Sequence, residues 1–170
     1  IDPPDPESNR IFEAWLDGYE IPTNGALVGN ELPPYAEQRI VHGGVQSIPY
    51  FYDNSVGYSE ATLTLIYPRD WTENGINTLS IWFRGDSDNA AELLYVALDR
   101  GAVVSHDNPD AAQITTWTQW NIDLQAFADQ GVNLANVNTI ALGLGNKKNP
   151  VAGGSGTMYF DDIRLYRLTP

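Results

Sequence analysis

The fold follows from short alternating stretches, the clearest of which is Leu79-Ser80-Ile81-Trp82-Phe83-Arg84. In an extended chain its aliphatic and phenylalanine side chains point one way, and Ser80, Trp82 and Arg84 point the other way. A period of two is typical of a β-strand that buries one face. The stretch therefore predicts a strand with an apolar core face and an outer face that carries an indole and a guanidinium group.

The same signature recurs along the chain. Leu93–Asp99 alternates in this way, and Trp117–Leu124 places Trp120 with the core side chains and Trp117 on the opposite face. Gly, Asn, Asp and Pro separate such runs, which indicates an all-β protein, a two-sheet antiparallel β-sandwich. One short helix is expected at Leu124–Gln130. We predict strands at Arg10–Trp15, Gln38–Val41, Val45–Tyr52, Glu60–Tyr67, Thr78–Arg84, Leu93–Asp99, Ala102–Ser105, Thr116–Asp123, Thr139–Leu144 and Thr157–Leu168.

Composition limits the function classes. The chain has 170 residues, which suits one domain, and 9 Lys plus Arg against 22 Asp plus Glu give a net charge of −13. Such an acidic surface repels phosphate backbones and anionic membranes, so neither nucleic acid nor membrane is an expected partner. No Cys is present, which excludes disulfides, thiolate zinc sites and a cysteine nucleophile.

The amino-acid composition of the first nine residues differs from that of the rest of the chain. Residues 1–8 hold three prolines and three acidic residues, without the basic and apolar regions of a signal peptide. We interpret residues 1–9 as the remnant of a linker and residues 10–170 as one module of a longer chain.

The outer face of the predicted sheet is the first candidate site. If residues 79–84 and 93–99 form a hairpin, Trp82, Arg84 and Tyr95 lie near one another away from the core. Exposed aromatic rings favour a ligand that covers them, and sugar rings stack on such rings through their C–H faces. The alternative is that a loop or a second layer covers these rings, and for Trp117 this alternative is the stronger one.

Carboxylates inside the first and last predicted strands are the second candidate site. Glu13 follows Phe12, and Asp161 and Asp162 follow Phe160. Charges within apolar strands are costly unless they are paired or bind a cation, and an oxygen-rich site suits Ca²⁺. The alternative is that these acids face solvent on edge strands.

His42-Gly43-Gly44 is a third candidate, because paired glycines suggest a tight turn into a strand. His42 would either contact a ligand or cap that turn. The spacing of the two histidines does not support a histidine metal centre. No pair of carboxylates stands out for glycoside hydrolysis, and we expect no catalytic residues.

Several runs together resemble one family in their order and spacing. These are Phe12-Glu13, Gly43–Ser47, Leu79–Gly85, Tyr95–Leu98, Trp117–Leu124 with Phe127 and Val132–Leu134, and the closing Gly154–Tyr166, which includes Tyr159-Phe160-Asp161-Asp162-Ile163. The chain is similar to the calcium-binding β-jelly-roll carbohydrate-binding modules, which are galactose-binding-domain-like. It also resembles uncharacterised domains of large secreted bacterial proteins.

The resemblance implies a non-catalytic module that targets a larger secreted, extracellular protein to a polysaccharide. It implies a structural Ca²⁺ whose ligands map to Glu13 and Asp161, with Asp162 next. Of the two binding surfaces that the family uses, the sheet face and the edge loops, only the sheet face maps to residues of this chain. We expect a monomer in which Trp82 and Tyr95 stack sugar rings. A structural or adhesive module without sugar affinity is the alternative, and a glycoside hydrolase or lyase is a more distant one. The remaining candidate ligand-binding residues are Arg84, Gln46, Asn54 and Trp117.

Overall fold

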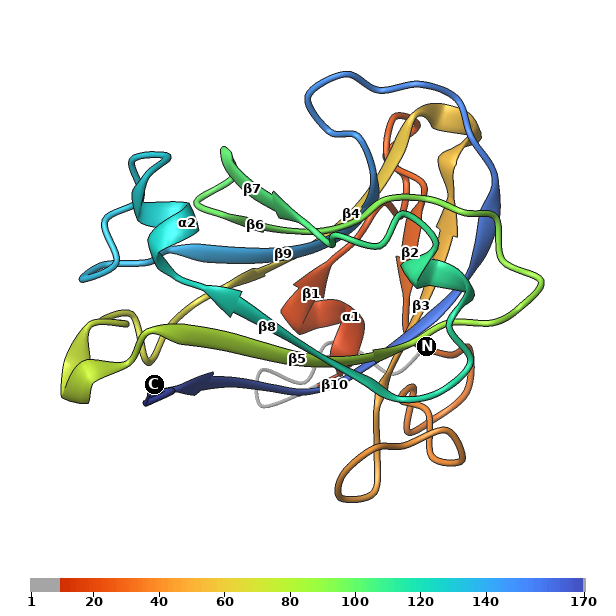
Figure 1. The fold of residues 1–170 in the computed structure, drawn as a ribbon. Helices are drawn as coiled ribbons and strands as arrows, with labels where there is room; N and C mark the ends of the chain where they lie inside the picture. Colours follow the sequence, from red (N-terminus) through yellow and green to blue (C-terminus); the bar gives the residue numbers. More distant parts are fainter. Residues whose placement is uncertain (1–9, 170) are drawn as a thin grey trace.

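The structure is a computed structural model that describes residues 10–169, so the predicted linker remnant at residues 1–9 lies outside the described residues. Two antiparallel sheets of five strands pack face to face (Figure 1), which confirms the predicted β-sandwich. Sheet A has the order β1-β4-β9-β6-β7, and sheet B has the order β2-β3-β10-β5-β8. Neighbouring strands are therefore mostly distant in sequence, as in a jelly roll.

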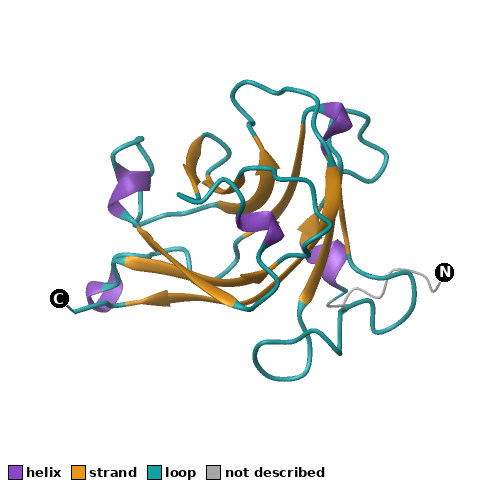
Figure 2. Cartoon of the chain, turned by 45° about the vertical axis from the view of Figure 1, so that its right-hand side comes forward, coloured by secondary structure: helices purple, strands orange, loops and turns teal. Residues whose placement is uncertain are grey.

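The elements are short, and loops make most of the connections between them (Figure 2). Within residues 10–169, no helix is both long enough and apolar enough to span a lipid bilayer. Sheet A contains β1 (Trp15–Leu16), β4 (Tyr58–Thr64), β6 (Leu94–Leu98), β7 (Ala102–Ser105) and β9 (Thr139–Gly145). Sheet B contains β2 (Ala26–Val28), β3 (Ile48–Asp53), β5 (Thr78–Arg84), β8 (Thr118–Asp123) and β10 (Ser155–Tyr166). The helical turns are α1 (Ile11–Ala14), α2 (Gln125–Ala128), η1 (Asn54–Val56), η2 (Glu73–Gly75) and η3 (Ala111–Gln113).

The core between the sheets follows the predicted alternation. Leu79, Ile81 and Phe83 of β5 are buried against β6, whose Leu94, Val96 and Leu98 are also buried. Each such side chain stabilises the fold by about 1.5–3 kcal/mol when it leaves water. Trp120 packs against the same core, as its parity with Ile122 predicts.

Two local predictions are wrong, and one strand is missing from the prediction. Arg10–Trp15 begins with the helical turn α1, because the amides of Glu13 and Ala14 both donate to the carbonyl of Arg10. Gln38–Val41 is a loop, since one carboxylate oxygen of Glu37 accepts hydrogen bonds from the three amides that follow it. The short strand β2 was not predicted.

The predicted hairpin between residues 79–84 and 93–99 is also wrong. β5 belongs to sheet B and β6 belongs to sheet A, and residues 85–93 cross from one sheet to the other. The core-facing residues of the two strands meet, so their alternate residues point away from each other. Trp82 and Tyr95 therefore lie on opposite outer faces of the sandwich.

Candidate carbohydrate-binding surface

On the outer face of sheet B, the indole of Trp82 is stacked under an imidazole. The ring centroids of His42 and Trp82 are 3.7 Å apart, and the ring planes differ by 16°. His42 belongs to the loop that precedes β3, so the loop folds back over the sheet. Trp82 is only partly exposed, and the ring of His42 covers it.

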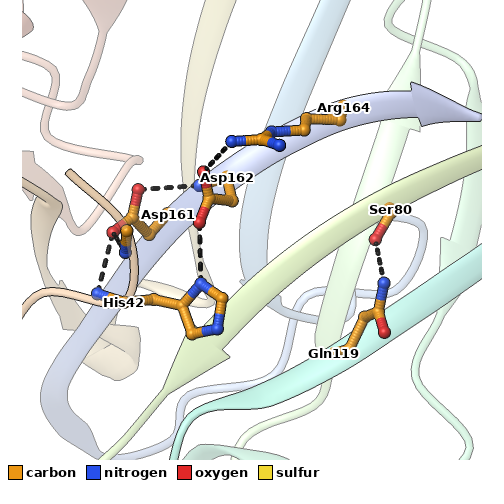
Figure 3. Close-up of polar contacts among 7 residues, drawn as sticks. His42, Ser80, Gln119, Asp161, Asp162 and Arg164 are labelled. Carbon is orange, nitrogen blue, oxygen red and sulfur yellow. Dashed lines mark hydrogen bonds and ion pairs between the residues drawn. The ribbon is translucent and has the colours of Figure 1, made fainter.

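Two adjacent carboxylates hold this loop in place (Figure 3). Asp161 Oδ2 accepts hydrogen bonds from the amides of His42 and Gly43 at 2.9 and 3.0 Å. The imidazole Nδ1 of His42 lies 2.7 Å from Asp162 Oδ2, and Arg164 donates to Asp162 Oδ1 at 2.6 Å. We call these contacts the His42 latch.

A β-bulge makes the latch possible. The pairing of β10 with β5 shifts between Asp161 and Arg164, and Asp162 has a φ of 44°. In a regular strand, consecutive side chains point to opposite faces, whereas a bulge redirects one of them. Both carboxylates therefore reach the same loop, which sequence alternation alone does not predict.

The latch also affects the charge of Asp162. Its hydrogen bond with His42, and to a lesser degree the charge of Arg164, lowers the pKa of the Asp162 carboxyl below its usual value. Gly43 fits closely here, because a Cβ atom at this position would stand 2.4 Å from Asp162 Oδ2. The carboxylate of Asp161, and not the ring of His42, accepts the amides of the glycine turn, so these contacts do not give His42 the capping role that the sequence suggests.

Beside the latch, Trp117, which directly precedes β8, adds another ring, and Gln119 of β8 adds a side-chain amide. The ring of Trp117 meets that of His42 edge to face, with centroids 5.8 Å apart, and Trp117 is partly exposed. The side-chain amide of Gln119 donates to Ser80 Oγ at 3.0 Å (Figure 3), which ties β8 to β5 on this outer face. The rings of Trp82, His42 and Trp117, which we call the ring cluster, are bordered by hydrogen-bonding groups.

The outer face continues from the ring cluster across three further strands. Arg84 pairs with Tyr159 of β10, and Thr157 of β10 pairs with Phe51 of β3. Phe51 is 40% exposed, and Leu27 beside it on β2 is exposed as well. Sequence analysis did not select Phe51 or Tyr159, although strand alternation places both on this face.

Tyr95 does not belong to this surface, and its predicted role in stacking is wrong. Its relative exposure is 0%, and its hydroxyl donates to Glu60 Oε2 at 2.8 Å. The ring lies over Gly143 of β9, where a Cβ atom would meet the ring at 2.1 Å. Burial and the neighbouring Glu60 carboxylate both raise the pKa of the Tyr95 hydroxyl.

Asn54 is also a structural residue rather than a ligand-binding one. It is fully buried, its amide donates to the carbonyl of Leu144 at 3.1 Å, and its oxygen accepts from Ser59 Oγ at 2.7 Å. Gln46 is exposed and lines a pocket of about 220 Å³ beside Asp161 and Asp162. No contact joins Gln46 to the ring cluster among residues 10–169.

The three predicted calcium ligands do not converge. Glu13 is exposed on α1 and pairs with Arg10 at 3.0 Å. Asp161 and Asp162 lie together, but both are engaged in the His42 latch. Within residues 10–169, no group of three or more His, Asp or Glu side chains is placed to hold a metal ion. The positions of Glu13, Asp161 and Asp162 therefore do not fit a shared calcium ion.

Several solved structures of other proteins have the same fold as this chain. A family 30 carbohydrate-binding module of a cellulosomal cellulase from Clostridium thermocellum matches with a TM-score of 0.54 and 16% identity, over 77% of this chain and 80% of that one. A family 11 carbohydrate-binding module matches with a TM-score of 0.55 and 18% identity, over 92% of this chain and 88% of that one. The chain has the jelly-roll fold of carbohydrate-binding modules.

A larger protein contains the same fold as one part. An exo-β-agarase matches with a TM-score of 0.64 and 14% identity, over 98% of this chain but only 24% of the agarase. No family model matches the sequence, and no curated protein matches it.

Proposed function

We propose that the outer face of sheet B binds a carbohydrate chain and that the protein is a non-catalytic carbohydrate-binding module. The ring cluster carries the proposal, because its rings are at least partly exposed on the outer face of sheet B and lie beside hydrogen-bonding side chains. In this account Trp117 and His42 contact the sugar rings. Trp82 supports His42 from below, which differs from the direct stacking that the sequence suggested.

The surface extends in the way that a polymer requires. Neighbouring strands lie about 4.8 Å apart, so the three steps from β8 to β3 span roughly 14 Å. Along this direction Gln119, Arg84 and Tyr159 offer hydrogen bonds, and Phe51 offers a second exposed ring. An extended saccharide of several residues would contact both ends of this face.

The expected affinity of one module is weak. A stacked ring contributes roughly 1 kcal/mol by analogy with aromatic pairs, and association itself costs several kcal/mol. Binding in the micromolar to millimolar range follows, and strong attachment would come from several contacts along one polymer.

The biological role that fits is targeting. We infer that the module belongs to a longer extracellular chain and holds the rest of that chain on its polysaccharide. The likeness to one quarter of an exo-β-agarase and to modules of cellulosomal cellulases supports this role. Agaro-oligosaccharides and cello-oligosaccharides are therefore the first ligands to try.

A glycan array with the wild-type protein and Trp117→Ala tests the proposal. We expect binding to neutral oligosaccharides that falls about fivefold in Trp117→Ala, which corresponds to one lost ring contact. Tyr19→Ala is the matched control, because Tyr19 is 72% exposed and lies in the loop before β2, far from β8. Equal binding by all three proteins would contradict the site, and no binding at all would favour the adhesive alternative.

Calcium binding is a separate hypothesis that rests on the resemblance and on the carboxylates within the predicted strands. The contacts of Asp161 and Asp162 argue against these two residues as ligands of a bound ion. Melting curves with calcium and with a chelator test the hypothesis, since an ion that binds only the folded state raises the midpoint. An unchanged midpoint would contradict a structural calcium ion.

A further inference from the structure

The outer face of sheet A holds a small pocket that is unlike the rest of this acidic protein. It has a volume of about 200 Å³ and lies between β7 and the loop that follows β9, which rises above the sheet in Figure 1. Both lysines of the chain, Lys147 and Lys148, line it. The remaining lining residues are Leu93, Val103, Ser105, Gly145 and Asn146.

The ammonium group of Lys147 is held in a fixed position. It donates to Glu60 Oε1 at 2.8 Å and to the carbonyl of Arg100 at 2.9 Å. Glu60 is itself fixed by the hydroxyl of Tyr95. An ammonium group has three N–H donors, so one donor of Lys147 has no partner within residues 10–169.

The other polar groups of the pocket are donors too. Asn146 Oδ1 already accepts the amides of Lys148 and Asn149, both at 3.1 Å, which leaves its NH₂ group available. Within residues 10–169, the side chains of Lys148 and Ser105 make no hydrogen bond or ion pair. Among the described residues, no Asp or Glu lines the pocket, although Glu60 pairs with Lys147 at its edge.

We propose that this pocket binds an anionic group, a sulfate ester or a carboxylate, carried by a saccharide. Two lysines, an amide NH₂ and a hydroxyl complement oxyanions, and charge-assisted hydrogen bonds are the strong ones. The protein carries a net charge of −13, yet both of its lysines line this one pocket. Leu93 and Val103 offer apolar contacts to the C–H face of the sugar that carries the anion.

This site lies on the face opposite the ring cluster. Its anion selectivity is independent of the proposed function, whereas the choice of a saccharide as the carrier rests on it. The two sites would let one module distinguish an acidic polysaccharide from a neutral one.

Isothermal titration of three oligosaccharides tests the proposal: a neutral galactan, its sulfated form and an oligogalacturonate. We expect the sulfated form, the galacturonate or both to bind better than the neutral form, and Lys148→Gln to weaken that binding about tenfold. Arg167→Gln is the matched control, because it removes the same charge from an exposed position on the C-terminal segment after β10. We expect it to leave binding unchanged.

Three results of the titration would overturn the proposal. These are equal binding of charged and neutral forms, no binding of either charged form, and equal weakening by Lys148→Gln and Arg167→Gln. Amide NMR shifts separate this site from the ring cluster. Charged probes should shift the amides of Val103, Gly145 and Lys148, and these shifts should persist in Trp117→Ala even if the sheet B site fails. Shifts confined to the ring cluster would contradict the second site.

Discussion

The two outer faces of the sandwich look alike in sequence but differ in structure. Each has a strand that alternates between core side chains and an aromatic ring, Trp82 on β5 and Tyr95 on β6. On sheet B the indole stays near the surface under a single imidazole, whereas on sheet A the phenol ring is fully buried. Strand alternation therefore tells which face a ring occupies, but not what lies above it.

The difference comes from residues distant in sequence. Tyr95 is buried because Gly143 on the neighbouring strand leaves room for its ring and Glu60 accepts its hydroxyl. Trp82 is covered because a bulge in β10 turns two carboxylates toward the loop of His42. One aromatic ring fills the space above a glycine, and the other supports a loop that solvent still reaches.

The largest expected effect separates the two rings by stability. Tyr95→Ala should lower the free energy of unfolding by about 4 kcal/mol, because it empties a buried site and leaves Glu60 without one partner. Trp82→Ala should lower the free energy of unfolding by only about 2 kcal/mol, since part of that ring already contacts water. Urea denaturation of both variants checks this order. Equal losses, or a larger loss for Trp82→Ala, would contradict the contrast between the faces.

The next effect concerns the glycine under Tyr95. Gly143→Ala should cost about 3 kcal/mol, because the added methyl group would overlap the ring and force it to move. Gly101→Ala is the control, because Gly101 lies in the turn between β6 and β7 of the same sheet and, apart from its chain neighbours, no atom of the described residues lies within 4 Å of its Cβ position. If the two alanine variants have similar denaturation midpoints, Gly143 does not determine where Tyr95 lies.

On sheet B, removing the imidazole should have a smaller effect on stability. His42→Ala loses the stacking on Trp82 and the hydrogen bond to Asp162, which together contribute about 1.5 kcal/mol. Indole fluorescence should shift to longer wavelength as Trp82 becomes exposed. Val45→Ala, on the same loop and well exposed, should leave both measurements unchanged. An unchanged emission maximum in His42→Ala would show that the imidazole does not cover Trp82 in solution.

The smallest effect depends on pH. The pKa of Asp162 is lower in the folded protein than in the unfolded chain. The ionised carboxylate therefore stabilises the fold at neutral pH. This stabilisation is lost as the pH falls below about 4 and passes through the pKa of the folded state. Asp162→Asn should cost about 1 kcal/mol at pH 7, and asparagine tolerates the positive φ at this position. The difference from wild type should narrow in acid. A difference that stays constant from pH 7 to pH 3 would contradict the role of the charge.

The sequence predicts what depends on local pattern. It predicts the two-sheet sandwich, the core faces of β5 and β6 and the core position of Trp120, because strand periodicity carries this information. It does not predict that residues 85–93 cross between the sheets, and so it wrongly joins Trp82 to Tyr95. The bulge at Asp161 and Asp162 breaks the period of two, so the sequence does not show that both acids contact the loop of His42 and suggests a metal ion as their partner.

The five tryptophans provide the most direct test of the sheet B site, because their indole N–H groups report separate places. Trp82 and Trp117 belong to the ring cluster, Trp15 and Trp71 line an apolar pocket between the sheets, and Trp120 packs on the core. The measurement is an NMR titration of the indole signals with the neutral oligosaccharide that binds best on the array. The account predicts shifts at Trp117 and Trp82 and none at Trp15 and Trp71. Shifts at Trp15 or Trp71 alone, with Trp117 unmoved, would contradict it.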